Sequence, residues 1–150
     1  MKREYPPLFS PGIKKITMEE IDFLLKEPFP KSAKREILFK QFCQLFSKLK
    51  ELGIPLKIWI DGSFCTEKEE PNDIDIVIEI AEEIINSLPL DKQKQLDILL
   101  NNKINKVVYN CDTYYVASEK VHMLSYWRGW FGFCRDGETA KGFLVLEFNV

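Results

Sequence analysis

The sequence lacks the features that mark several common functional classes. It has four cysteines but no C-x-x-C pair, which argues against a zinc site or a redox dithiol. No polybasic arm or basic stripe is present, and the net charge is −2, so strong binding to duplex nucleic acid is not expected. The N-terminus has no apolar core of a signal peptide, and no apolar run could span a membrane. We therefore expect a cytoplasmic protein with reduced thiols and no membrane partner.

Repeats, low-complexity tracts and linkers are also missing from the 150 residues, which suffice for one domain with a sizeable core. Residues 1–16 contain three prolines and are predicted to form an extended arm before a single domain over residues 17–150. The only histidine, His122, has no cysteine near it in sequence. A surface or packed position is favoured for it over a catalytic one.

Helical and strand patterns alternate along the domain. Thr17 and Glu20 have capping-box spacing and predict a short helix to about residue 26, and Ser32 is expected to cap a longer helix that Gly53 ends. Further helices are predicted over residues 81–87, from a cap at Asp91, and from a cap at Ser118 to about residue 130. Strands are predicted over residues 56–60, 73–80, 104–109, 113–116 and 142–148. This order predicts an α/β (α+β) fold in which helices flank a mixed β-sheet.

Two short motifs in the middle of the chain carry the chemistry. Gly62-Ser63 follows an apolar strand, and a turn of this kind lets an anion approach backbone N–H groups and a hydroxyl. Asp73 and Asp75 begin the next strand and project from the same face, where two carboxylates repel unless a cation or proton lies between them. We favour a site for a metal-bound nucleotide over the alternative that both acids only cap the strand in solvent. Asp61 is expected to orient the turn and not to bind a metal.

The order Gly62-Ser63, a spacer, and Asp73-Ile74-Asp75-Ile76 resembles the signature of the polymerase-β-type nucleotidyltransferase superfamily. The whole of residues 62–75 further resembles short, stand-alone bacterial members of minimal nucleotidyltransferase type. Residues 126–133, 135–137 and 141–142 are also similar to that group. The resemblance extends from about residue 59 to the C-terminus and implies a nucleotidyltransferase-like mixed β-sheet flanked by helices.

On the nucleotide side, the resemblance implies that Gly62 and Ser63 hold the triphosphate of an incoming nucleoside triphosphate, most simply ATP. The spacer between the motifs carries three glutamates, at positions 67, 69 and 70, and a single cation, Lys68. We expect Lys68 to contribute to nucleotide binding.

On the metal side, the resemblance implies that Asp73 and Asp75 bind two Mg²⁺ ions. A third carboxylate usually comes from a later neighbouring strand, and Asp112 is the best candidate for it. Asp112 would ligate the catalytic metal and help to deprotonate the acceptor hydroxyl. The alternative is that Asp112 is a turn residue joining two strands.

The implied activity is Mg²⁺-dependent transfer of a nucleotidyl group, most simply AMP from ATP, to a hydroxyl of a protein, RNA or small molecule. Small members of the superfamily often act with a partner protein, and some are antitoxins that adenylylate a toxin, so a toxin–antitoxin or defence role is expected. The alternative is a catalytically degenerate module of the same fold that binds a nucleotide or masks a partner. The acidic spacer motivates this second hypothesis.

The C-terminal third of the chain is rich in aromatic residues. Trp127 and Trp130 are expected to lie in the core, because aromatic residues at helical spacing usually do. The alternative is that Trp127, Arg128 and Trp130 form a functional aromatic and cationic surface. Arg128, Arg135 and Lys141 are candidates for neutralising phosphate.

Overall fold

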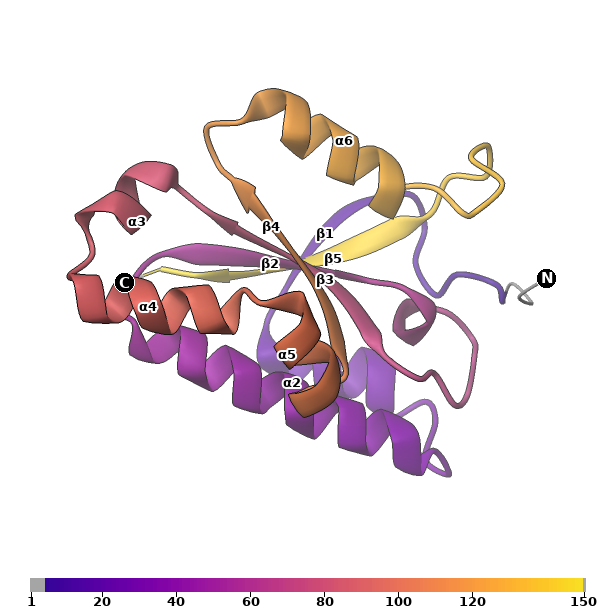
Figure 1. The fold of residues 1–150 in the computed structure, drawn as a ribbon. Helices are drawn as coiled ribbons and strands as arrows, with labels where there is room; N and C mark the ends of the chain where they lie inside the picture. Colours follow the sequence, from indigo (N-terminus) through magenta and orange to yellow (C-terminus); the bar gives the residue numbers. More distant parts are fainter. Residues whose placement is uncertain (1–4, 150) are drawn as a thin grey trace.

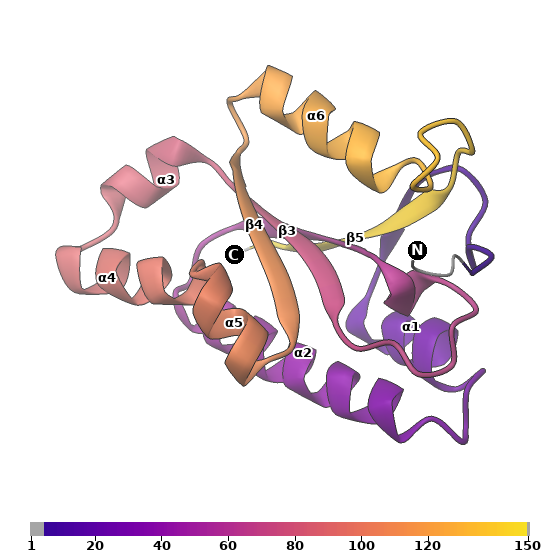
Figure 2. The same ribbon diagram turned by 45° about the vertical axis from the view of Figure 1, so that its right-hand side comes forward.

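One mixed β-sheet with helices on both faces forms the fold, which confirms the predicted class (Figures 1 and 2). The computed structural model describes residues 5–149, so the first four residues of the predicted arm lie outside the described part. The strand order is β1-β5-β2-β3-β4; β1–β5 and β3–β4 are parallel, and both pairs that involve β2 are antiparallel. The strands are β1 (Gly12–Ile16), β2 (Leu56–Asp61), β3 (Ile74–Ile80), β4 (Cys111–Ala117) and β5 (Gly142–Phe148).

The helices begin and end mostly where local signals predict. The Thr17 capping box starts the first helix, and the Ser32 hydroxyl accepts the Arg35 N–H at 3.1 Å to cap the longest one. Gly53, at φ +68°, follows the end of that helix. The helices are α1 (Met18–Ile21), which continues as the π-helix η1 (Asp22–Lys26), α2 (Ala33–Glu51), the 3₁₀-helix η2 (Ser63–Cys65), α3 (Glu82–Ser87), α4 (Leu90–Leu99), α5 (Asn102–Val108) and α6 (Val121–Phe131).

The two faces of the sheet carry two separate apolar clusters, because successive strand residues point to opposite sides. The larger cluster joins Ile58, Ile60 and Ile76 to Leu45 and other residues of α2. The smaller cluster joins central-strand residues such as Trp59 and Val77 to Phe131 of α6. In both ribbon views α2 and α6 therefore lie on opposite sides of the sheet (Figures 1 and 2). No helix among residues 5–149 has the length and apolar character needed to cross a membrane.

The prediction of a strand over residues 104–109 is wrong, because this segment belongs to α5. The Asn101 side chain accepts the Ile104 N–H at 3.1 Å and caps the helix. Buried Asn105 then donates to the Leu99 carbonyl at 2.7 Å and to the Thr113 hydroxyl at 3.1 Å. A short run with β-branched residues fits either element, and here the cap and these tertiary hydrogen bonds select the helix.

Two predicted helix caps are also wrong, and the predicted arm is partly ordered in the sheet. Pro89 and Lys120 stand at the N-caps of α4 and α6, in place of the predicted Asp91 and Ser118. Residues 12–16 are extended, as predicted, but they pair with β5 as strand β1. Four of these five residues are exposed at the edge of the sheet, so the sequence gives no alternating apolar pattern for them.

Candidate functional site

Three aspartates lie in register across the central strands. Asp61 on β2 is opposite Asp75 on β3, and Asp75 is in turn opposite Asp112 on β4. Residues in direct register point to the same face of a sheet, so the three carboxylates form one row. Asp73 directly precedes β3, next to this row. Asp112 is therefore a strand residue beside Asp75, and its alternative interpretation as a turn residue is wrong.

Burial and neighbouring charges raise the pKa of two carboxylates of this row. Burial, followed by the charges of Asp73 and Asp112, raises the pKa of Asp75 to about 6. Burial likewise raises the pKa of Asp61 to about 7, although Lys141 partly opposes this shift. Asp61 Oδ1 and Asp112 Oδ1 are buried without a hydrogen-bond partner. The row therefore has an excess of negative charge that a bound cation would relieve.

Asp112 is held by two neighbours. The Tyr114 hydroxyl donates to Asp112 Oδ2 at 3.1 Å, and Lys106 Nζ lies 3.6 Å from Asp112 Oδ1. Burial and the charge of Asp112 raise the pKa of Tyr114 to about 12, so this hydroxyl remains a donor at neutral pH. Within the described range, no three His, Cys, Asp or Glu side chains are arranged to hold a metal ion by themselves. Mg²⁺ commonly needs only one or two carboxylates beside substrate phosphates and water, and Asp73 and Asp75 fit that requirement.

Gly62 brings the two predicted motifs into direct contact. Its φ of +86° and ψ of −165° fall in a region that essentially only glycine adopts. A Cβ at this position would lie 2.6 Å from Asp75 Oδ2 and 2.9 Å from Asp75 Cγ. The Asp75 carboxyl group therefore packs directly against the Gly62 backbone. Ser63 follows at the start of η2, where the Gly62 carbonyl accepts the Cys65 N–H at 3.0 Å.

A buried arginine holds the loop after Gly62. The Arg35 guanidinium is fully buried, and it donates to the carbonyls of Phe64, Thr66 and Lys68 at 2.6–2.7 Å. It also donates to the Leu25 carbonyl at 2.8 Å, and burial lowers its pKa to about 10. Sequence reasoning missed this role of Arg35, because an arginine three residues after a helix cap gives no local sign of distant carbonyl partners.

A second missed feature is the pair between Lys141 and Asp61. Lys141 Nζ lies 2.9 Å from Asp61 Oδ2, and the two side chains are 14% and 5% exposed. Lys141 stands directly before β5, and its N–H donates to the Gly132 carbonyl at 2.8 Å. Asp61 thus holds a nearly buried ammonium group beside the carboxylate row. The other two basic candidates diverge: Arg135 lowers the pKa of Asp75 by its charge, whereas Arg128 lies over the Trp59 ring at 6.0 Å.

One cleft of about 1070 Å³ contains most of these groups. Of the predicted site residues, all except Asp112 line it: Gly62, Ser63, Lys68, Asp73 and Asp75. Asp112 is connected to the cleft through Tyr114, which lines it. Asp61, Lys141 and Arg135 line it as well. The turn after β2 and the loop between α6 and β5 lie at the same end of the sheet in both ribbon views (Figures 1 and 2).

One wall of the cleft, formed by residues of α6 and of the segment after it, is aromatic. Trp130 was expected in the core, but it is 62% exposed and lines the cleft, so that prediction is wrong. Trp127 is partly buried and packs against the smaller apolar cluster, although it also lines the cleft. On α6, Leu124, Trp127 and Phe131 face the sheet, and this arrangement leaves Tyr126 and Trp130 outside.

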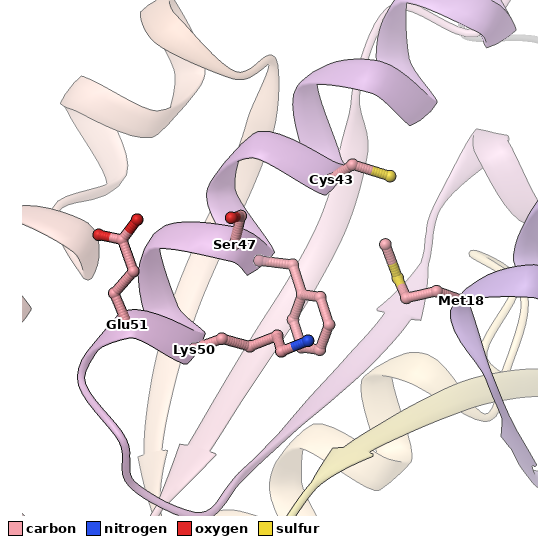
Figure 3. Close-up of a pocket in the computed structure, with 6 residues that line it drawn as sticks. Met18, Cys43, Ser47, Lys50 and Glu51 are labelled. Carbon is pink, nitrogen blue, oxygen red and sulfur yellow. The ribbon is translucent and has the colours of Figure 1, made fainter.

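A smaller hollow of about 490 Å³ is lined by residues of α2 and by Met18 of α1, and by none of the aspartates of the row (Figure 3). Cys43 and Met18 point toward each other across it, and burial raises the pKa of the Cys43 thiol. Its remaining lining residues are Phe46, Ser47, Lys50 and Glu51. A thiol kept protonated beside a thioether offers little for catalysis, so the larger cleft is the candidate site.

Comparison with known proteins gives one match. A family model described as "Family of unknown function (DUF6932)" matches residues 3–147. Neither the search of curated proteins nor that of solved structures finds a match.

Proposed function

The chain belongs to DUF6932, a family of unknown function, and we propose that it is a Mg²⁺-dependent nucleotidyltransferase. In this proposal it moves a nucleotidyl group, most simply AMP from ATP, to a hydroxyl of a protein, RNA or small molecule. The observation that carries the proposal is the packing of Asp75 against the Gly62 backbone, within a row of three aspartates at a large cleft.

The charge of the row supports a cation site. Burial, followed by the charges of Asp73 and Asp112, raises the pKa of Asp75, and a bound cation would favour its ionised form. Asp73 and Asp75 would hold Mg²⁺ together with phosphate oxygens, and two ions are expected from the resemblance. When bound, Mg²⁺ stabilises the attacking and leaving oxygens of an in-line displacement.

The residues of the chain have separate tasks in this reaction. Gly62 and Ser63 bind the triphosphate through the backbone and the hydroxyl, and Lys68 and Lys141 offset its charge. The acceptor oxygen forms a bond to the α-phosphorus while the bond to the pyrophosphate oxygen breaks. The proton of the acceptor hydroxyl passes toward Asp112, the base that the resemblance implies, which is connected to the cleft through Tyr114. Pyrophosphate then leaves the cleft.

One observation favours the second candidate, a degenerate nucleotide-binding module that masks a partner protein. Tyr114 and Lys106 both engage Asp112, so its carboxylate is occupied by protein groups. The acidic spacer also favours the degenerate module, because its glutamates repel phosphate. In either version the site uses nucleoside triphosphates, so we include a cytoplasmic location and a toxin–antitoxin or defence partner in the proposal.

The test measures transfer and pyrophosphate release with α-labelled nucleoside triphosphates, Mg²⁺, RNA and candidate proteins. We expect Asp73→Asn and Asp75→Asn to abolish both, while Asp97→Asn, an exposed aspartate on α4, keeps them. Mg²⁺-dependent ATP binding without pyrophosphate release in the wild type would identify the degenerate module. Absence of both binding and release would contradict both versions.

A further inference from the structure

The aromatic wall of the cleft is unusually exposed. Trp130 is 62% exposed, Tyr126 is 51% exposed and Phe133 is 41% exposed, and all three line the cleft. Large aromatic side chains usually gain stability by burial, so several of them together at one concave surface indicate a binding site. Leu124, Trp127 and Phe131 pack α6 against the sheet. The three exposed rings are not part of this packing, so it does not explain why they are aromatic.

Two of these exposed rings, Tyr126 and Trp130, are connected to the carboxylate row by a continuous series of ring contacts. Tyr114, whose hydroxyl donates to Asp112, has its ring centroid 4.5 Å from that of Trp127. Trp127 is 5.1 Å from Tyr126, and Tyr126 is 6.3 Å from Trp130. A flat group that stacks on the outer rings would therefore lie in the same cleft as the reacting carboxylates.

The chemistry of the cleft selects among flat ligands. Acids, three cations (Lys68, Arg135 and Lys141) and the aromatic rings all line this one cleft, which suits a ligand with phosphates at one end and a π-face at the other. The cleft volume of about 1070 Å³ exceeds the usual need of one small ligand.

From these observations we propose that Tyr126, Trp130 and Phe133 form a nucleobase-stacking platform beside the carboxylate row. This inference rests on the proposed function for the nucleotide nature of the ligand. The base belongs either to the donor nucleoside triphosphate or to a nucleotide acceptor with an unpaired base, and stacking is equally suited to both.

The test compares three probes by equilibrium binding in the presence of Mg²⁺: ATP, inorganic tripolyphosphate, and a short single-stranded oligoribonucleotide. Trp130→Ala is matched to Phe23→Ala, because Phe23 is 64% exposed on η1 and does not line the cleft. Loss of one stacked base weakens binding by about 5- to 100-fold. Trp130→Phe keeps an aromatic face and should retain most of the affinity. Since Trp130 is exposed, circular dichroism should show every variant folded.

The pattern of losses identifies the source of the base. If ATP binds more weakly to Trp130→Ala while tripolyphosphate is unchanged, the platform holds the donor base. If only the oligoribonucleotide is weakened, the platform holds the acceptor base. Equal affinity of Trp130→Ala and wild type for both base-containing probes would overturn the platform and leave the proposed function intact. Absence of wild-type binding to all three probes would overturn both.

Discussion

The substitution Gly62→Ala tests the contact that joins the two halves of the site. The added Cβ would lie 2.6 Å from Asp75 Oδ2 and 3.2 Å from Asp75 Cβ, so rotating the carboxylate away relieves only part of the overlap. Alanine also has to adopt a φ of +86° with ψ of −165°, which costs about 1–3 kcal/mol. Forcing an extra methyl group into a packed site costs about 1–3 kcal/mol more. We therefore expect the free energy of unfolding to fall by about 2–6 kcal/mol.

Gly53→Ala is the matched control for backbone strain. Gly53 also has a positive φ, +68°, but a Cβ there meets nothing within 4 Å. This variant should lose only about 1–2 kcal/mol of stability. Urea unfolding at neutral pH, analysed by linear extrapolation, measures both differences. Binding of Mg²⁺ with ATP should be lost in Gly62→Ala and kept in Gly53→Ala.

A double-mutant cycle separates the steric part from the backbone part. Asp75→Ala removes the carboxyl group that the new methyl group would strike most closely, so in this background Gly62→Ala should cost the backbone strain and only a small remainder from the Cβ at 3.2 Å. If Gly62→Ala is no more destabilising than Gly53→Ala, or if its cost is the same with and without the Asp75 carboxyl group, the contact between Gly62 and Asp75 does not constrain the site.

Three further predictions concern the buried charges. Arg35→Lys should lower the free energy of unfolding by about 3 kcal/mol or more, because an ammonium group cannot reach the four carbonyls that the guanidinium binds. The same variant should be cleaved faster by proteases within residues 64–68. An unchanged rate of cleavage would argue against the role of Arg35 in holding this loop. In EDTA, Asp75 binds more protons in the folded than in the unfolded state between about pH 4 and pH 6, so its contribution to stability falls as the pH rises through that window. Asp75→Asn should therefore be up to about 3 kcal/mol more stable than wild type at pH 7.5, with no difference near pH 4 by urea unfolding. Lys141→Gln should cost about 3–5 kcal/mol by leaving Asp61 buried and unpaired, and adding Asp61→Asn should restore stability but not tripolyphosphate binding.

Much of the local structure follows from short-range signals. The Thr17 and Ser32 caps, the Gly53 stop and the final strand Gly142–Phe148 all lie where the sequence predicts them. These features depend on a few neighbouring residues, and each has a local physical cause. The prediction of a strand over residues 104–109 is wrong because distant contacts matter there. Hydrogen bonds from Asn105 to Leu99 and Thr113, both outside that segment, help to stabilise a helix instead.

The exposure of the aromatic residues could not be predicted from helical spacing alone. Spacing indicates which residues share a face of α6, but not how much of the helix the sheet covers. Because α6 packs on the sheet as a single helix, only its inner residues are buried, and Trp130 remains in solvent. The interpretation of Trp130 as a core residue assumed a second layer of packing that this face of the sheet does not have.

The sequence by itself determined the two motifs, their order and the strands that carry them, because a Gly-Ser turn and an Asp-x-Asp strand are local patterns. Three contacts depend on the tertiary structure: Asp112 lies beside Asp75, and Asp61 pairs with Lys141. In the third, Arg35 binds the carbonyls of the loop after Gly62. Strand register and buried ion pairs join residues that are tens of positions apart. Such contacts form because the whole chain buries its apolar surface together, and no short segment contains the information that selects them.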